Sequence, residues 1–208
     1  MNNWGTAVRL FIILALITGV LYPLTIMLAG SVFMPNQASG SLVTVNGVVV
    51  GSTLIEQAPF QVDENGQIAN LDAITGYFWG RPSATNAMLG STNDVLGSSG
   101  GSNLGPTSDL LQAQVTAREA AFREANDVPE SLSVPAEMLF ASASGLDPHI
   151  SPEAAFLQVD RVALARSLSA GEVASLVSQH IEHPVLNIFG VPRVNVLALN
   201  LALDALAS

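Results

Sequence analysis

The 208-residue chain has no cysteine, and its seven cationic side chains are all arginines, so it also has no lysine. Without cysteine it can form neither disulfides nor thiolate metal sites. Without lysine it cannot build the phosphate loop G-x-x-x-x-G-K-[ST], whose lysine contacts the β- and γ-phosphates. A formal net charge of -10 argues against nucleic acid or an anionic membrane surface as a partner, because both are bound through basic patches.

Charge is nearly absent from the start of the chain, where Arg9 is the only charged side chain among the first 55 residues. Residues 10–29, LFIILALITGVLYPLTIMLA, are uncharged and long enough as a helix to cross the hydrocarbon layer, which is about 30 Å thick. A cleaved signal peptide is the alternative, but its apolar region is usually about 7–15 residues long. We therefore predict a membrane anchor over residues 1–34, followed by a single domain over residues 35–208.

The anchor also carries signals of orientation and of contact with other helices. Arg9 and the amino terminus supply the positive charge near it, which predicts a cytoplasmic N-terminus and an extracytoplasmic domain. Ala15 and Gly19 form a small-xxx-small pair, which lets another membrane helix approach closely, so both are candidate subunit contacts. Pro23 removes a helical hydrogen bond and predicts a kink.

Beyond the anchor, strand signals are followed by helix signals. Asn46-Gly47 and Asn65-Gly66 lie between apolar or β-branched residues and predict hairpins, because Asn-Gly accepts the positive φ angles of a type I′ turn. Caps and apolar stripes then predict helices over residues 109–126, 152–167 and 194–207. Ser169-x-x-Glu172 forms a capping box before VASLVSQHIEH, residues 173–183, and predicts a further helix that is capped at Ser169 and reaches residue 183. The helix over residues 194–207 is apolar nearly all round and should be buried. This order favours the α+β class.

Residues 77–90, YFWGRPSATNAMLG, combine three aromatic side chains with one arginine, and could be either a recognition loop or part of the core. Aromatic side chains are found in cores more often than in ligand sites, so the core interpretation is favoured. The following stretch, residues 90–107, is rich in glycine, serine, threonine and asparagine and is predicted to be a loop.

Within that loop, Gly97-Ser98-Ser99-Gly100-Gly101 matches the G-x-S-x-G pattern of hydrolases. Asp147 and then His149, His180 or His183 follow in the hydrolase order. A nucleophile elbow needs a strand running into the motif and a helix leaving it, whereas here loop lies on both sides. An anchored hydrolase using Ser99 is therefore kept only as the alternative function.

The histidines offer a possible metal site, which the local sequence does not favour. His180 and His183 are three residues apart on a predicted helix, with Glu182 between them, but Pro184 follows at once. In the last turn of a helix an imidazole also complements the helix dipole, so capping is favoured over zinc. Asp147-Pro148-His149 is typical of an Asx turn that leads into the next helix. No metal site is predicted.

Five blocks of the chain, in this order, resemble the C subunit of the Kdp potassium-transporting ATPase. They are YFWGRPSA (77–84), SSGGSNLGPTS (98–108), ASASGLDPHISPEAA (141–155), QVDRVALAR (158–166) and GVPRVNVLALNLALD (190–204). The resemblance implies an accessory subunit, noncatalytic by itself, of an ATP-driven potassium uptake complex in a prokaryotic plasma membrane. Its partners would be a channel-like subunit that carries potassium and a P-type ATPase subunit. ATP and K⁺ would be handled by the complex, with no cofactor bound tightly by this chain.

The resemblance also suggests site residues. It implies a nucleotide or subunit contact, linked to a role as a catalytic chaperone that raises ATP affinity, at Ser98, Ser99, Gly100, Gly101, Ser102 and Asn103. A domain outside the cell would meet little ATP, which favours subunit contact for this loop. We expect further subunit contacts at Arg81, Asp147 and His149. Members of the family tend to have glycine where this chain has Glu56, so the local loop shape is expected to differ there.

Overall fold

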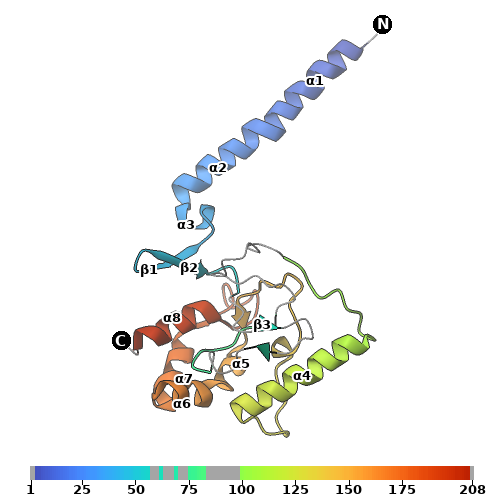
Figure 1. Ribbon diagram of the computed structural model, residues 1–208. Coiled ribbons are helices and arrows are strands. Elements are labelled where there is room, and N and C mark those ends of the chain that lie inside the picture. Colours follow the sequence, from blue (N-terminus) through green and yellow to red (C-terminus); the bar gives the residue numbers. More distant parts are fainter. Residues whose placement is uncertain (1–2, 57–60, 63–67, 70–74, 83–98, 207–208) are drawn as a thin grey trace. The chain divides into compact units, whose positions relative to one another are not determined.

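The computed structural model describes residues 3–56, 61–62, 68–69, 75–82 and 99–206 (Figure 1). The chain divides into two compact units, Met1–Leu42 and Val43–Ser208, which are described separately. Helix and sheet are mixed in the chain, as the α+β prediction requires.

The first unit is dominated by one long apolar helix. It consists of α1 (Trp4–Leu16), the π-helical turn η1 (Ile17–Leu21) and α2 (Tyr22–Phe33), and a short helix, α3 (Pro35–Ala38), follows. The helix from Trp4 to Phe33 has 30 residues and contains an 18-residue stretch with a mean hydropathy of 2.4, so it is long and apolar enough to cross a membrane. None of the residues of α1, η1 or α2 is buried, as expected of a helix whose apolar surface is covered by lipid or by another protein.

Pro23 affects this helix through its hydrogen bonds. Proline has no N–H, so the α-helical bond to the carbonyl of Gly19 cannot form. The turn before it is π-helical, and the Tyr22 N–H donates to the carbonyl of Ile17, five residues back. The chain therefore widens by one π turn where a kink was predicted, and α1 and α2 continue as one rod in Figure 1.

The first strands form the predicted hairpin. β1 (Leu42–Val45) pairs with β2 (Val48–Ser52), and between them Asn46 and Gly47 have φ values of 50° and 80°. Two consecutive positive φ angles are what a type I′ turn requires, so this prediction is confirmed. β3 (Gln61–Val62) pairs with β4 (Ile68–Ala69) in antiparallel register. The second Asn-Gly pair, Asn65-Gly66, lies outside the described residues.

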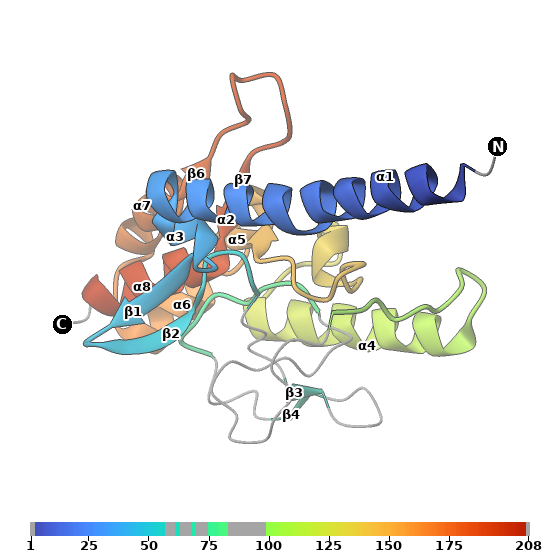
Figure 2. The same cartoon turned by 90° about the horizontal axis from the view of Figure 1, so that it is seen from above.

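A small antiparallel sheet organises the rest of the second unit. It has the order β5-β7-β6, formed by His149–Ile150, Arg193–Asn195 and Ile181–Glu182. The helices are α4 (Asp109–Asn126), the 3-10 turn η3 (Ala136–Met138), α5 (Pro152–Phe156), α6 (Val159–Arg166), α7 (Ala170–Gln179) and α8 (Val196–Leu206). α5 and α8 contact β7, and α7 contacts α5, α6 and α8 (Figures 1 and 2). One core lies between them, with Val162, Val177, Leu199 and Val194 fully buried.

Three predicted helices keep their predicted starts. The Ser151 hydroxyl accepts a hydrogen bond from the Ala154 N–H at the start of α5. The Ser108 hydroxyl accepts a hydrogen bond from the Leu111 N–H at the start of α4, and Ser169 and Glu172 form a reciprocal capping box on α7. α4 also carries the expected pair of charges one turn apart, with Arg123 Nη2 2.7 Å from Glu119 Oε1.

Three helix boundaries were predicted wrongly. The helix expected over residues 152–167 is interrupted at Leu157 and Gln158, because the Gln158 side chain turns inward to bind backbone groups of another segment. The helix expected to reach residue 183 ends at Gln179, and Ile181 and Glu182 pair with β7 instead. Residues 194–195, expected to be helical, also belong to β7.

Candidate functional site

The site rests on residues 75–82, which form a turn at residues 75–77 followed by irregular chain and are held by side chains of the helices. The Phe78 N–H donates to Asn200 Oδ1 (2.8 Å), and the Asn200 amide donates back to the Phe78 carbonyl (3.0 Å). Gln158 makes the same pair of bonds to Trp79, at 2.7 and 3.1 Å. Each side-chain amide therefore takes the place of a neighbouring strand. Phe78 and Trp79 are buried, which confirms the core interpretation of the aromatic cluster.

Two arginines of α6 complete this support. Arg161 donates from Nη1 to the carbonyls of Thr75 and Tyr77, and its guanidinium lies 4.2 Å from the centre of the Trp79 ring. Arg166 Nε donates to the Gly76 carbonyl (2.7 Å), and its guanidinium lies over the ring of Tyr77. All five carbonyls from Thr75 to Trp79 therefore accept bonds from side chains of the second unit. This fixes the position of the next charged residue, Arg81.

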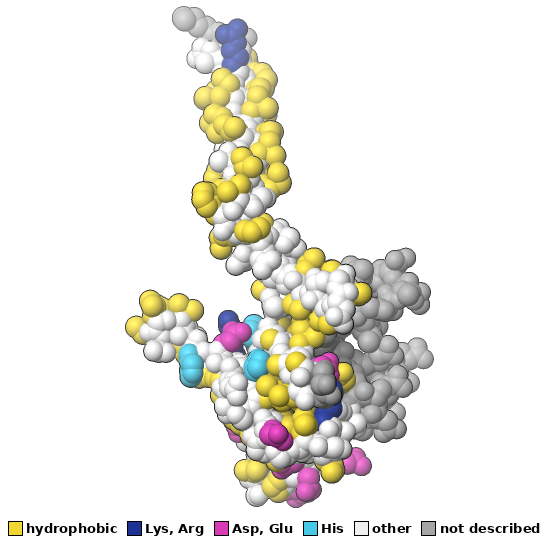
Figure 3. All heavy atoms as spheres, turned by 90° about the vertical axis from the view of Figure 1, so that its left-hand side faces the viewer, with side chains coloured by type: hydrophobic (Ala, Val, Ile, Leu, Met, Phe, Trp, Pro, Cys, Tyr) yellow, Lys and Arg dark blue, Asp and Glu magenta, His cyan; other side chains and the backbone are white. Residues whose placement is uncertain are grey.

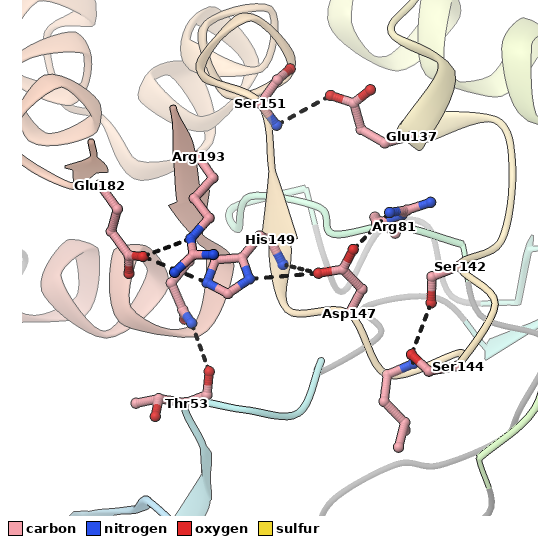
Figure 4. A network of polar contacts seen from close by, with 12 residues as sticks. Thr53, Arg81, Glu137, Ser142, Ser144, Asp147, His149, Ser151, Glu182 and Arg193 are labelled. Atoms are coloured by element: carbon pink, nitrogen blue, oxygen red, sulfur yellow. Dashed lines mark hydrogen bonds and ion pairs between the residues drawn. The ribbon is translucent and has the colours of Figure 1, made fainter. Parts of the chain in front are cut away.

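Arg81 begins a line of ionisable side chains that crosses the sheet (Figure 4). Its Nη1 lies 2.7 Å from Asp147 Oδ2. The His149 ring lies between two carboxylates, with Nδ1 3.5 Å from Asp147 Oδ1 and Nε2 3.8 Å from Glu182 Oε2. Arg193 Nε then donates to Glu182 Oε2 at 2.9 Å. The line is partly accessible to solvent, so it can present charge to a partner.

Local structure places each of these groups. Asp147 Oδ1 accepts the His149 N–H (3.2 Å), which is the predicted Asx turn, and the turn leads into β5. Glu182 and Arg193 are direct partners in the pairing of β6 with β7, so the sheet register brings their charges together. On β7, Asn195 also donates to the Thr53 carbonyl (2.8 Å), which ties the end of β2 to the sheet.

Glu56 is a neighbour of Arg81 and Asp147 and is almost completely buried, with 3% of its surface exposed. Among the described residues no side chain bonds either carboxylate oxygen, and the Arg81 backbone N–H approaches them without forming a full hydrogen bond. The nearby Arg81 Nε is also without a partner there. Burial, followed by the negative charge of Asp147, raises the pKa of Glu56 to about 9, although Arg81 acts in the opposite direction. Glu56 is therefore protonated at neutral pH. The Glu56 side chain also accounts for the lack of a side chain at Gly80, because a Cβ there would lie 2.5 Å from Glu56 Oε1.

The described part of the glycine-rich loop packs against residues 142–145. The Gly100 N–H and the Ser99 hydroxyl both donate to the Ser144 carbonyl, at 2.8 and 3.1 Å. A Cβ on Gly101 would lie 3.1 Å from the Ala143 carbonyl oxygen, whereas one on Gly100 would meet nothing within 4 Å. Gly101 is therefore the glycine of this pair at which a side chain would crowd the neighbouring backbone. The structure brings this loop next to the segment that carries Asp147.

The remaining members of the loop have local roles. Ser102 Oγ accepts from the Leu104 N–H (3.4 Å), and Asn103 has a left-handed backbone with φ of 53°. Ser98 lies outside the described residues. In the described part of the chain no hydrogen bond joins Ser99 to a histidine, so the pairing that a serine hydrolase needs is not formed there. His180 Nδ1 lies 2.8 Å from the Leu176 carbonyl oxygen at the end of α7, where capping was predicted.

Comparison with known proteins identifies the family. The family model described as "K+-transporting ATPase, c chain" matches residues 4–205. A potassium-transporting ATPase KdpC subunit of Dechloromonas aromatica is 46% identical over 201 residues, which cover 97% of this chain and 96% of that protein. The corresponding subunit of Burkholderia cenocepacia (strain HI2424) is 48% identical over 198 residues, covering 95% and 93%. That of Polaromonas naphthalenivorans is 46% identical over 205 residues, covering 99% and 95%.

The chain belongs to the KdpC family. The resemblance found in the sequence is thereby confirmed over almost its whole length. Of the residues that we expected to be KdpC subunit contacts, Arg81, Asp147 and His149 are joined in one line of charge. Ala15 and Gly19 lie in the apolar helix of the first unit, where both are exposed.

The sequence did not reveal the side chains that hold residues 75–82 and the line from Arg81 to Arg193 in place. Gln158 and Asn200 gave no signal, because a polar side chain inside a predicted helix is ordinarily exposed. Glu182 and Arg193 were not linked to His149, since their contact depends on a strand that was predicted to be helix. Glu56 stood out only as a departure from the family pattern.

Proposed function

We propose that this chain is the accessory KdpC subunit of an ATP-driven potassium uptake complex, in which it holds a channel-like subunit and a P-type ATPase subunit together. The observation that carries the proposal is the similarity, over nearly the full chain, to proteins named as subunits of a potassium-transporting ATPase. In this proposal the complex hydrolyses ATP and moves potassium, and the chain itself supplies contacts.

The long apolar helix serves as the anchor. Its exposed surface between Trp4 and Phe33 would be covered by lipid and by a partner helix, with Ala15 and Gly19 allowing close approach. Arg9 lies near its N-terminal end, which supports a cytoplasmic N-terminus. The second unit would then lie outside the cytoplasm, where it can contact the outer face of the channel-like subunit.

The hydrogen bonds of the glycine-rich loop favour a role in subunit contact over a role in nucleotide binding. A phosphate at this loop would need free donors, such as backbone N–H groups. The Gly100 N–H and the Ser99 hydroxyl are already directed to the Ser144 carbonyl. In this proposal any effect of the subunit on the ATP affinity of the complex is transmitted through its contacts with the ATPase subunit.

Purification of the affinity-tagged chain from detergent-solubilised membranes tests the proposal. We expect two larger membrane proteins to co-elute, and the eluted complex to hydrolyse ATP in response to potassium. As a control, Ser99→Ala should keep this activity, because its hydroxyl only donates to a backbone carbonyl. Elution of the chain as a monomer, or loss of its activity with Ser99→Ala, would contradict the proposed role.

A further inference from the structure

The connection between β6 and β7, residues 183–192, projects from the second unit, and its hairpin, residues 184–192, carries an apolar tip (Figures 2 and 3). The hairpin sequence, PVLNIFGVP, contains no charged residue. Five large apolar side chains within it are between 66% and 79% exposed: Val185, Leu186, Ile188, Phe189 and Val191. Large apolar side chains gathered in one exposed place mark an interaction surface, whereas single ones do not.

This hairpin is held in a defined shape. Val185 and Phe189 exchange two backbone hydrogen bonds of 3.0 Å, and the Asn187 N–H donates to the Pro184 carbonyl at 2.9 Å. Leu186 and Asn187 both have φ of 56°. A left-handed backbone is unusual for a bulky residue such as leucine, and such conformations gather at functional sites. The hairpin therefore displays its apolar side chains from a fixed backbone, which lowers the entropy lost on binding.

We propose that the hairpin 184–192 docks into an apolar pocket on another protein subunit of the complex, on the side of the membrane where the second unit lies. The inference rests on the function proposed above. Charged and polar groups surround the base of the hairpin: Glu182 and Arg193 form an ion pair there, and His183 lies beside them. An apolar centre with a polar rim is the usual composition of a protein interface.

Lipid is the less suitable occupant. Segments that insert into the membrane surface combine apolar side chains with several lysines or arginines that meet anionic headgroups. Here the chain has no lysine and carries a net charge of -10, and Glu182 lies at the base of the hairpin. An irregular backbone turn is also costly inside hydrocarbon, because its polar groups find no partners there.

Loss of the apolar tip should weaken the complex. In the full-length tagged chain, Leu186→Ser with Ile188→Ser should retain about tenfold less of the larger subunits after detergent purification. The matched control is Leu132→Ser with Leu164→Ser, two leucines that are 50% and 84% exposed outside the hairpin. The control should retain the larger subunits as the wild-type chain does. Equal retention by both variants, or equal loss in both, would overturn the inference.

A photo-crosslinking amino acid in place of Ile188 identifies the occupant directly. Illumination of whole membranes should yield a product that contains one of the larger subunits. Products with lipid only, with a second copy of this chain only, or no product at all would overturn the inference. If the wild-type chain co-purifies with no larger subunit, the proposed function itself has failed. If it co-purifies while the hairpin gives no such product, only the docking inference has failed.

Discussion

At the scale of single residues, Glu56 is a carboxyl group in a place that favours its neutral form. The Arg81 guanidinium, which would otherwise neutralise it, is directed through Nη1 to Asp147. Among the described residues both Glu56 oxygens are left without a hydrogen bond, and the side chain fills the space beside Gly80. The carboxyl therefore contributes packing, and its ionisation opposes folding.

Replacing Glu56 by glutamine should stabilise the fold in a pH-dependent manner. The pKa of Glu56 is raised from 4.5 to about 9 in the folded state. Below pH 4.5 the carboxyl is protonated in both states and costs nothing. As the pH rises from 4.5 towards about 9, the unfolded chain ionises while the folded one does not, so wild-type stability is lost at about 1.4 kcal/mol per pH unit. Glu56→Gln lacks this loss.

The difference between the two proteins in free energy of unfolding should therefore grow from near zero at pH 4.5 to about 3 kcal/mol at pH 7. Urea unfolding of the full chain in detergent, followed by tryptophan fluorescence at several pH values, measures it. Glu130→Gln is the control, because Glu130 is exposed. A difference that stays constant with pH would show that Glu56 is ionised in the folded protein.

At the scale of elements, local chemistry made some parts of the fold predictable. The type I′ turn at Asn46-Gly47, the cap at Ser108 and the capping box at Ser169 depend on neighbouring residues only, and all three are present. The apolar helix could also be predicted, since its length and lack of charge are properties of the sequence itself.

Other elements depend on partners that lie far away in the chain. β6 has only two residues, and their local sequence is typical of the end of a helix. They form a strand because they can make backbone hydrogen bonds to β7. The break at Gln158 exists because Trp79 needs partners for its backbone groups. The charged line from Arg81 to Arg193 joins residues over 100 positions apart. No spacing rule along the sequence could have assembled it.

Gln158 offers a test of how much such a distant partner contributes. Its side chain accepts from the Trp79 N–H and from Arg161, and donates to the carbonyls of Trp79 and Ala154. Gln158→Ala removes all four bonds inside the core, and a buried polar group left without a partner costs about 1–3 kcal/mol. We expect the free energy of unfolding to fall by roughly 3–5 kcal/mol.

Gln179→Ala is the matched control. Gln179 is exposed on α7 and donates one hydrogen bond, to Ser175. Its removal should change the free energy of unfolding by less than about 0.5 kcal/mol. Denaturant unfolding of both variants under the same conditions gives the comparison. Similar losses for the two glutamines would show that residues 75–79 are held mainly by the arginines of α6.

At the scale of the whole molecule, the distribution of charge sets the proposed topology. All 17 acidic residues follow residue 55, while the first unit has one charged side chain, Arg9. Because basic residues near a membrane helix favour the cytoplasm, the proposal places the N-terminus inside and the second unit outside. The lack of cysteine makes this directly measurable, since a thiol introduced at one position would be the only one in the chain.

Two single-cysteine variants should therefore respond in opposite ways to a membrane-impermeant maleimide. Ser131→Cys lies at an exposed position of the second unit and should be labelled in intact cells, after removal of any outer membrane. Asn3→Cys lies before the apolar helix and should be labelled only after the cells are permeabilised. The cysteine-free parent chain controls for background. Labelling of Asn3→Cys but not Ser131→Cys in intact cells would reverse the topology. The hairpin 184–192 and the charged line would then have to meet cytoplasmic surfaces, where ATP is available.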